Sequence, residues 1–281
     1  MVYDSTMTKI VKRALFFSFF AYFFSWLLWL PLYAGRLGFF IPGWIPGFHF
    51  LGSFGPILAA FLFLFRYRDG AVSLHGTVRR MFTLPKIATM TRIEVAAITL
   101  SPVFFLVAIL VSQAVATNSQ QGLLVFMNGV IGGGFLLKLV LDLFTFGFGE
   151  ETGWRGVLVP LLQSRFSIVQ TAVITTFIWA GWHLPMFLYR DGYVGMSGGM
   201  ILGWFMSLFF GSVTLSYLLN RSKGSILIVA LFHTTIDFAF TYDRLSQENA
   251  TTIGVAVTVL GMVLLLKEVR NKNKKYVLEE V

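Results

Sequence analysis

The sequence predicts an all-α protein, a polytopic bundle of about eight transmembrane helices with both termini in the cytoplasm. Three observations lead to this prediction. Hydrophobic residues make up 56% of the 281 residues and charged residues only 12%, whereas a soluble domain is about 25% charged. Apolar stretches long enough to cross a bilayer recur along the chain. Lys and Arg gather in alternate connections between these stretches.

A membrane-spanning helix needs about 20 mostly apolar residues. Stretches of roughly this length cover residues 14–33, 48–65, 93–116, 135–162, 168–189, 200–219, 225–242 and 251–266. Most of the 22 Lys and Arg lie at the N-terminus, after the second, fourth and sixth stretches, and in the C-terminal tail. Because basic residues mark the cytoplasmic side, this alternation places both termini there. Residues 1–281 therefore form a single integral membrane domain, in the plasma membrane if the protein is bacterial.

The composition also excludes several classes of function. The chain has no Cys, so neither disulfides nor thiol chemistry contribute. Its net charge of +9 reflects membrane topology rather than binding to nucleic acid, because the basic residues follow the predicted loops. The lipid bilayer is the partner that the sequence itself requires. No repeat of fixed period and no inverted pair of broken helices, such as many transporters show, is apparent.

Two adjacent carboxylates, Glu150 and Glu151, lie within the fourth stretch and are followed by Arg155. Ionisable groups in an apolar setting are costly and are kept mainly where they function or pair. Glu151 and Arg155 are four residues apart with the acid first, the favourable order for an ion pair on a helix. Glu150 is then free to face a different partner. The Glu151–Arg155 pair also has a purely structural interpretation, as an ion pair that holds helices together.

Three further polar residues fall at about the same depth in the bilayer as Glu150. From a rise of 1.5 Å per residue, Glu150 lies about 18 Å from the cytoplasmic end of its helix and His183 about 22 Å. His233 lies at about 12 Å and Asp237 at about 18 Å, and they share a helix face because they are four residues apart. We therefore expect Glu150, His183, His233 and Asp237 to surround one pocket.

Other polar and aromatic residues have simpler interpretations. Lys138 and Asp142, four residues apart, are expected to form a satisfied ion pair without chemistry. His49 and His75 fall in predicted loops and are expected to be solvated. The tryptophans near the motifs line a cleft for an apolar substrate or are ordinary membrane aromatics; they are Trp154, Trp179 and Trp182.

These motifs resemble the three-motif signature of the CPBP family, the type II CAAX prenyl endopeptidases and their bacterial relatives, the Abi or bacteriocin-processing proteins. The motifs are Glu150-Glu151-x-x-x-Arg155, then Trp179-Ala-Gly-Trp-His183 with Phe177 just before it, then His233-x-x-x-Asp237. They occur in the family order, and the resemblance covers about residues 123–242. The wording Glu-Glu-x-Gly-Trp-Arg-Gly and Trp-His-Leu-Pro is similar to the bacterial branch.

The resemblance implies an intramembrane peptidase in which Glu150 is the general base that activates water and His183 helps to hold that water. It further implies that His233 and residue 237 stabilise the oxyanion, for which donors must already be in place, and that Glu151 and Arg155 support the site. The prenyl-protease pattern has Asn at the last position, where this chain has Asp237. An ionised Asp accepts hydrogen bonds and donates only when it is protonated.

Two mechanisms stay open from the sequence. The preferred one requires no cofactor, because no His-Glu-x-x-His motif is present. In the other, Glu150, His183, His233 and Asp237 hold Zn²⁺ through N and O ligands. In both mechanisms the substrate is a membrane-associated or apolar peptide or protein. One version of the hypothesis has a lipid-modified substrate. The alternative functions are a catalytically silent family member that acts as a membrane scaffold or immunity factor, and a small proton-coupled transporter.

Overall fold

The computed structural model describes residues 5–39, 48–68, 72–84, 134–241 and 247–270, and these are almost entirely helical, without a β-strand among them. The all-α class is therefore confirmed. The first part holds α1 (Ser5–Tyr33), η1 (Ala34–Leu37), α2 (Phe48–Gly52), α3 (Gly55–Arg66) and α4 (Leu74–Phe82). A continuous helical run follows as α7 (Gly134–Asp142), η3 (Leu143–Glu150), α8 (Glu151–Gly153), η4 (Trp154–Leu158) and α9 (Val159–Gln163). The last helices are α10 (Ile168–Trp182), α11 (Met186–Tyr189), α12 (Gly198–Arg221), α13 (Ile226–Thr241) and α14 (Gln247–Arg270).

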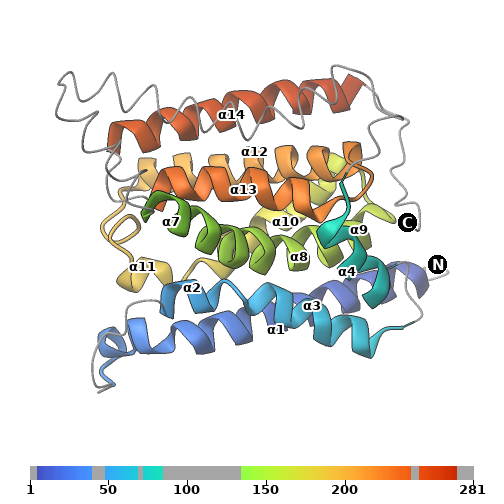
Figure 1. Cartoon of the computed structure of the whole chain (residues 1–281), viewed down its shortest axis with the longest axis horizontal. Coiled ribbons are helices and arrows are strands. Elements are labelled where there is room, and N and C mark those ends of the chain that lie inside the picture. Colours follow the sequence, from blue (N-terminus) through green and yellow to red (C-terminus); the bar gives the residue numbers. More distant parts are fainter. Residues whose placement is uncertain (1–4, 40–47, 69–71, 85–133, 242–246, 271–281) are drawn as a thin grey trace.

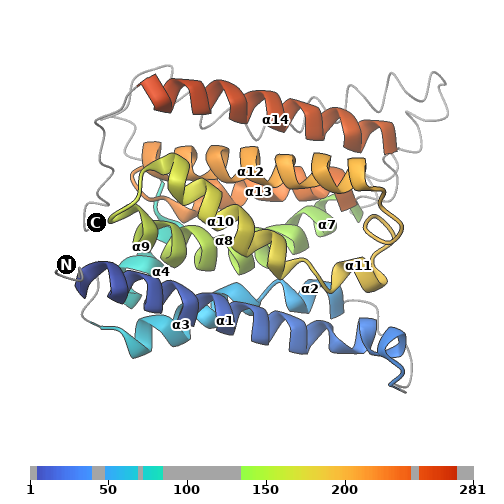
Figure 2. The same ribbon diagram turned by 180° about the vertical axis from the view of Figure 1, so that it is seen from behind.

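The long helices lie side by side in a bundle (Figure 1 and, from behind, Figure 2). Helices α1 and α3 pack together on one side, and α14 packs on α12 at the opposite side. The run from α7 to α9 lies between them, with η3 against α13. The acidic motif is therefore carried by a central helix that has packed neighbours on several sides.

Four helical segments in the described part are long and apolar enough to cross a membrane. They are Thr6–Leu37, Phe48–Arg66, Ile168–Tyr189 and Gly198–Arg221, and α13 adds a shorter apolar stretch, Ile226–Phe238. The four coincide with the predicted stretches 14–33, 48–65, 168–189 and 200–219. The length and apolar composition of these helices indicate an integral membrane protein. Eight crossings and cytoplasmic termini stay predictions, and the stretch 93–116 lies outside the described residues.

A short capped turn reverses the chain between α9 and α10. Ser167 Oγ accepts a hydrogen bond from Gln170 N at 3.2 Å, and Gln170 Oε1 accepts one from Ser167 N at 3.0 Å. This reciprocal arrangement satisfies two N–H groups that the start of a helix leaves without partners. Helix α10 consequently starts at once and runs back toward the level of the acidic motif.

Gly147 allows α13 to approach the central helix closely. A Cβ atom on Gly147 would lie 2.6 Å from Thr234 Oγ1 and 3.1 Å from Ala230 O. Small residues at such crossings let two backbones come together. Because His233 precedes Thr234, this contact brings the imidazole beside the carboxylates of the central helix.

The expectation that His49 is solvated was wrong. His49 lies in α2 and is partly buried, with Nδ1 3.0 Å from Tyr189 Oη and its ring stacked on Trp29 at a centroid distance of 6.1 Å. No pattern in the sequence indicated that Tyr189 of α11 would contact His49 of α2. His75 is exposed, as expected, although it lies in α4 rather than in a loop.

Candidate active site

The acidic motif lies where the central helix widens. The helix is π-helical over η3, which ends at Glu150, and again over η4, which begins at Trp154. Such widened turns are rare and occur frequently at functional sites. Both acids are buried, with exposed fractions of 3% for Glu150 and 0% for Glu151. Buried carboxylates need polar partners, and each of the two has its own set.

Glu151 is paired as the sequence predicted. Its Oε1 lies 2.8 Å from Arg155 Nη1, and both side chains are fully buried. The same oxygen lies 2.7 Å from His233 Nδ1. The guanidinium of Arg155 also lies over the ring of Trp179, at 4.9 Å from its centroid. Glu151 therefore joins the central helix to α13 through one carboxylate oxygen.

Glu150 faces away from this pair toward two indoles. Its Oε2 accepts hydrogen bonds from Trp179 Nε1 at 3.0 Å and from Trp154 Nε1 at 3.3 Å. Both bonds end on one carboxylate oxygen. The two tryptophans hold the carboxyl group in a fixed direction without supplying a charge of opposite sign. The indoles therefore orient the ionised carboxylate, which is the form that acts as a base.

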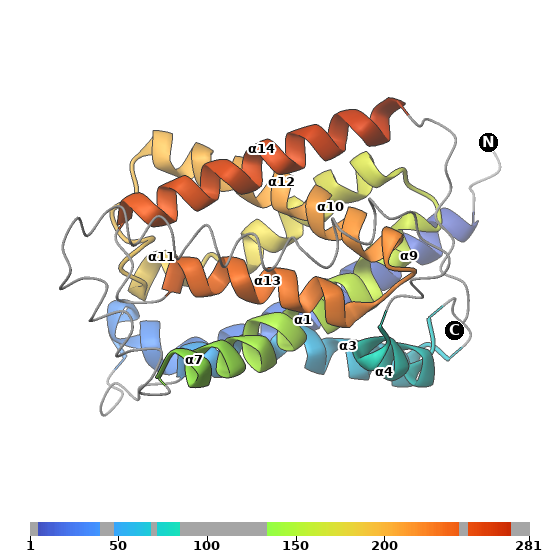
Figure 3. The same ribbon diagram turned by 45° about the horizontal axis from the view of Figure 1, so that its top comes forward.

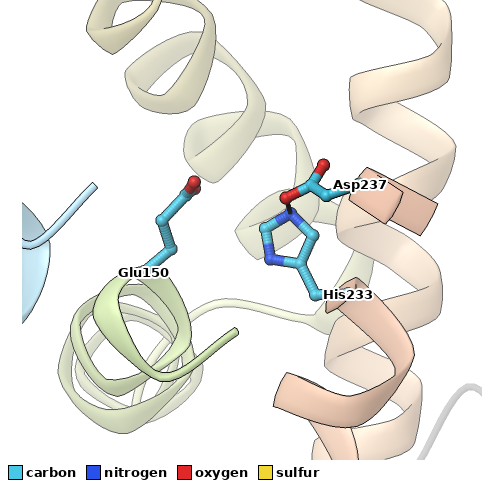
Figure 4. A group of neighbouring side chains, drawn as sticks. All are labelled: Glu150, His233 and Asp237. Carbon is cyan, nitrogen blue, oxygen red and sulfur yellow. Dashed lines mark ion pairs between the residues drawn. The ribbon is translucent and has the colours of Figure 1, made fainter. Parts of the chain in front are cut away.

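His233 and Asp237 face Glu150 from the neighbouring helix, α13 (Figure 4). His233 Nε2 lies 3.3 Å from Asp237 Oδ2. One ligand atom each from Glu150, His233 and Asp237 lies within 4.8 Å of the other two. The side chain of Asp237 is 22% exposed, against 5% for that of His233. The group is thus compact and buried, and it is most open at Asp237.

His183 lies at the end of α10, outside that compact group. Its Nδ1 is 2.7 Å from the backbone oxygen of Trp179. Because a carbonyl oxygen only accepts, Nδ1 is the donor and Nε2 of the neutral ring is left as an acceptor. The imidazole packs between the rings of Trp182, at a centroid distance of 4.9 Å, and Tyr193, at 6.1 Å.

Trp179 contacts four of the six predicted site residues, a role that sequence reasoning missed. Its N–H donates to Glu150, its backbone oxygen accepts from His183, and its ring lies under Arg155. The ring also meets His233 edge-on at a centroid distance of 5.4 Å. Its spacing of four residues from His183 was the only available signal, and this spacing places both side chains on one helix face.

The structure thus brings Glu150, His233 and Asp237 together, with Glu151 and Arg155 beside them. The separate pairing of Lys138 and Asp142 is confirmed, with Nζ 2.5 Å from Oδ2. The buried acid Glu150 and the His233 imidazole, which lies between the carboxylates of Glu151 and Asp237, can accept a proton, store it and donate it. These are the operations that hydrolysis by an activated water requires.

Only three of the four predicted metal ligands lie close enough together to hold one divalent ion. Imidazole nitrogen and carboxylate oxygen are both zinc ligands, so Glu150, His233 and Asp237 offer three ligand atoms of a suitable kind. Glu151 beside His233 Nδ1 matches the carboxylate that usually orients a metal-bound histidine. His183, the fourth predicted ligand, is not within the compact group. In a metal form, Glu150, His233 and Asp237 would hold the ion.

The fold and the site together define an integral membrane protein with a buried cluster of acids and imidazoles. Residues 132–239, which include all six predicted site residues, match the family model described as Type II CAAX prenyl endopeptidase Rce1-like. CAAX prenyl protease 2 of Methanococcus maripaludis is 26% identical over 196 residues, which cover 65% of this chain and 69% of that protein. Both matches support the CPBP family for this chain, and with it a CAAX-protease-like endopeptidase.

Proposed function

We propose that this protein is an intramembrane endopeptidase in which Glu150 activates a water molecule for attack on a peptide bond. The observation that carries the proposal is the convergence of Glu150, His233 and Asp237, whose ligand atoms lie within 4.8 Å of one another in a buried group. One water molecule can touch all three at this separation. The carboxylate removes a proton from the water, and the resulting oxygen nucleophile attacks the peptide carbonyl carbon.

The oxyanion that forms needs donors on the α13 side. His233 Nδ1 lies 2.7 Å from Oε1 of Glu151, a carboxylate that only accepts, so we place a hydrogen on Nδ1 and leave Nε2 as the nitrogen that faces the reacting groups. A proton held by the pair of His233 Nε2 and Asp237 Oδ2, which lie 3.3 Å apart, turns to the oxyanion as it forms and supplies the donor. The proton taken up by Glu150 passes to the leaving amine as the C–N bond breaks. His183, with Nε2 as an acceptor, helps to hold the water.

The substrate is a peptide or a segment of a protein that reaches the site within the membrane. The word prenyl comes from the description of the family model and from the name of the Methanococcus relative. We propose a membrane-associated or apolar substrate, and a lipid-modified one is a separate arm of the test. The preferred mechanism uses no cofactor. The second mechanism uses zinc held by Glu150, His233 and Asp237, and it is supported by the closeness of their ligand atoms.

The test is cleavage of a peptide library by the purified protein, with farnesylated and unmodified peptides in parallel. Glu150→Gln keeps the size of the side chain and removes the base, so we expect cleavage to fall by about 10²–10⁴-fold. Glu268→Gln, a buried carboxylate in α14 next to Arg221, is the matched control and should retain activity. Cleavage that survives in the Glu150→Gln protein would refute the assigned base. A metal assay and a chelator arm on the same sample separate the two mechanisms.

A further inference from the structure

Helix α4 packs at one end of the bundle, where the central helix leaves the site and α13 begins (Figure 3). Arg80 on this helix is buried, with an exposed fraction of 6%. Its Nη2 donates to Gly156 O at 2.8 Å and to Thr77 Oγ1 at 3.2 Å. Burial lowers the pKa of Arg80 to about 10, so the guanidinium stays charged at neutral pH.

The carbonyl of Gly156 has a reason to need an outside donor. In an α-helix it would accept a hydrogen bond from the N–H four residues later, but that residue is Pro160, which has no N–H. This turn also belongs to the π-helical segment η4, which contains Arg155. Arg80 therefore donates to a carbonyl whose partner in the four-residue pattern is a proline.

Gly156 lies where three helices meet. A Cβ atom there would be 3.1 Å from Ile226 Cδ1 of α13 and 3.4 Å from Thr77 Cγ2 of α4. The end of α4 is joined to α13 as well, because Ser225 Oγ donates to Thr83 O at 2.6 Å. Helix α4 thus bridges the helix that carries the acids and the helix that carries the imidazole.

We propose that Arg80 is a positioning residue, whose bond to Gly156 holds α4 in place and fixes the Arg155 turn relative to α13. This inference rests on the proposed peptidase function. Arg80 touches no reacting group; it acts through Gly156 and Arg155 on Glu151, which lies 2.8 Å from Arg155 and 2.7 Å from His233. Loss of the bond shifts the turn that holds Arg155, and with it the support of Glu151.

The kinetic test compares Arg80→Met, which removes the donors and keeps the apolar stem, with the conservative Arg80→Lys. We expect kcat to fall about tenfold in Arg80→Met, because small misplacements of catalytic groups cost rate steeply. KM should stay at its wild-type value, and Arg80→Lys should recover part of kcat. A purely structural role would instead lower the amount of folded protein while kcat per folded molecule stayed constant, and that result would overturn the proposal.

A second measurement is independent of proteolysis and uses the absence of native Cys. Thr77→Cys places a thiol on the buried face of α4, where the wild-type side chain is fully buried. His75→Cys places a thiol at an exposed position of the same helix. Maleimide labelling of position 77 should be slow with Arg80 and clearly faster in the Arg80→Met background, while position 75 labels equally in both. Equal labelling of position 77 in the two backgrounds overturns the proposal. If the wild-type protein cleaves nothing, the proposed function fails, and the labelling result still decides whether Arg80 holds α4.

Discussion

The indole N–H of Trp179 donates a hydrogen bond to the carboxylate of Glu150 at 3.0 Å. The two residues are 29 positions apart in the sequence and lie on different helices. The residue beside the proposed base is therefore an aromatic donor and not a charged partner. Hydrogen bonds to charged groups are stronger than neutral ones, at about 1.5–3 kcal/mol each. The bond fixes the direction in which Glu150 faces the imidazole on α13.

Trp179→Phe tests this bond, because it keeps an aromatic ring and removes the N–H. We expect kcat to fall about tenfold with little change in KM, since the loss corresponds to a single hydrogen bond to a carboxylate. Trp154 Nε1, at 3.3 Å from the same oxygen, still holds Glu150 in part. Steady-state kinetics on the purified variants give the result. Trp204→Phe is the matched control, because Trp204 packs on His183 and makes no hydrogen bond to Glu150 among the bonds described. This variant should keep a higher kcat than Trp179→Phe.

Glu151→Gln should destabilise the protein by about 3–5 kcal/mol, because it leaves the fully buried Arg155 without its counter-ion. Replacing both members, as Glu151→Gln with Arg155→Met, should restore much of this stability without restoring activity. Thermal unfolding in detergent measures the first effect and peptide cleavage the second. A double variant no more stable than Glu151→Gln alone would show that the ion pair is not the source of the loss.

The sequence was sufficient for the parts of the site that follow from helix periodicity. Residues four apart on one helix, such as Glu151 with Arg155 and His233 with Asp237, had to share a face, and the structure places both pairs in contact. The depth estimate was sufficient to bring Glu150 to the level of Asp237. These inferences need only the rise and the turn of an α-helix.

Other parts depended on features that periodicity does not encode. The bond from Trp154 to Glu150 has the four-residue spacing of a helix face, but the bond from Trp179 comes from another helix and was not predictable from spacing. The bond between Arg80 and Gly156 joins residues that are 76 positions apart. His49 was misplaced because its partner, Tyr189, is brought near only by the packing of α11 on the bundle.

Gly147→Ala should lower both stability and activity. The added Cβ would lie 2.6 Å from Thr234 Oγ1, so α13 must move away and His233 moves with it. Overpacking of this kind costs about 1–3 kcal/mol. Thr234→Ala removes the obstructing oxygen, and the double variant should recover part of the loss. The midpoint of thermal unfolding and kcat are measured for all three variants; a double variant that is additive in both would contradict this explanation.

Asp237→Asn separates the two mechanisms at the position where this chain differs from the prenyl-protease pattern. An Asn amide donates a hydrogen bond at any pH, whereas an Asp does so only while protonated. In the metal-free mechanism we therefore expect kcat to stay close to the wild-type value and activity to extend to higher pH, because the donor at 237 no longer depends on a proton. In the zinc mechanism the variant loses one of three ligands, and both bound zinc and kcat fall, the latter about a hundredfold or more. The pH profile and the zinc content of the same preparation decide between these outcomes, and a variant that loses activity together with its metal would contradict the metal-free mechanism.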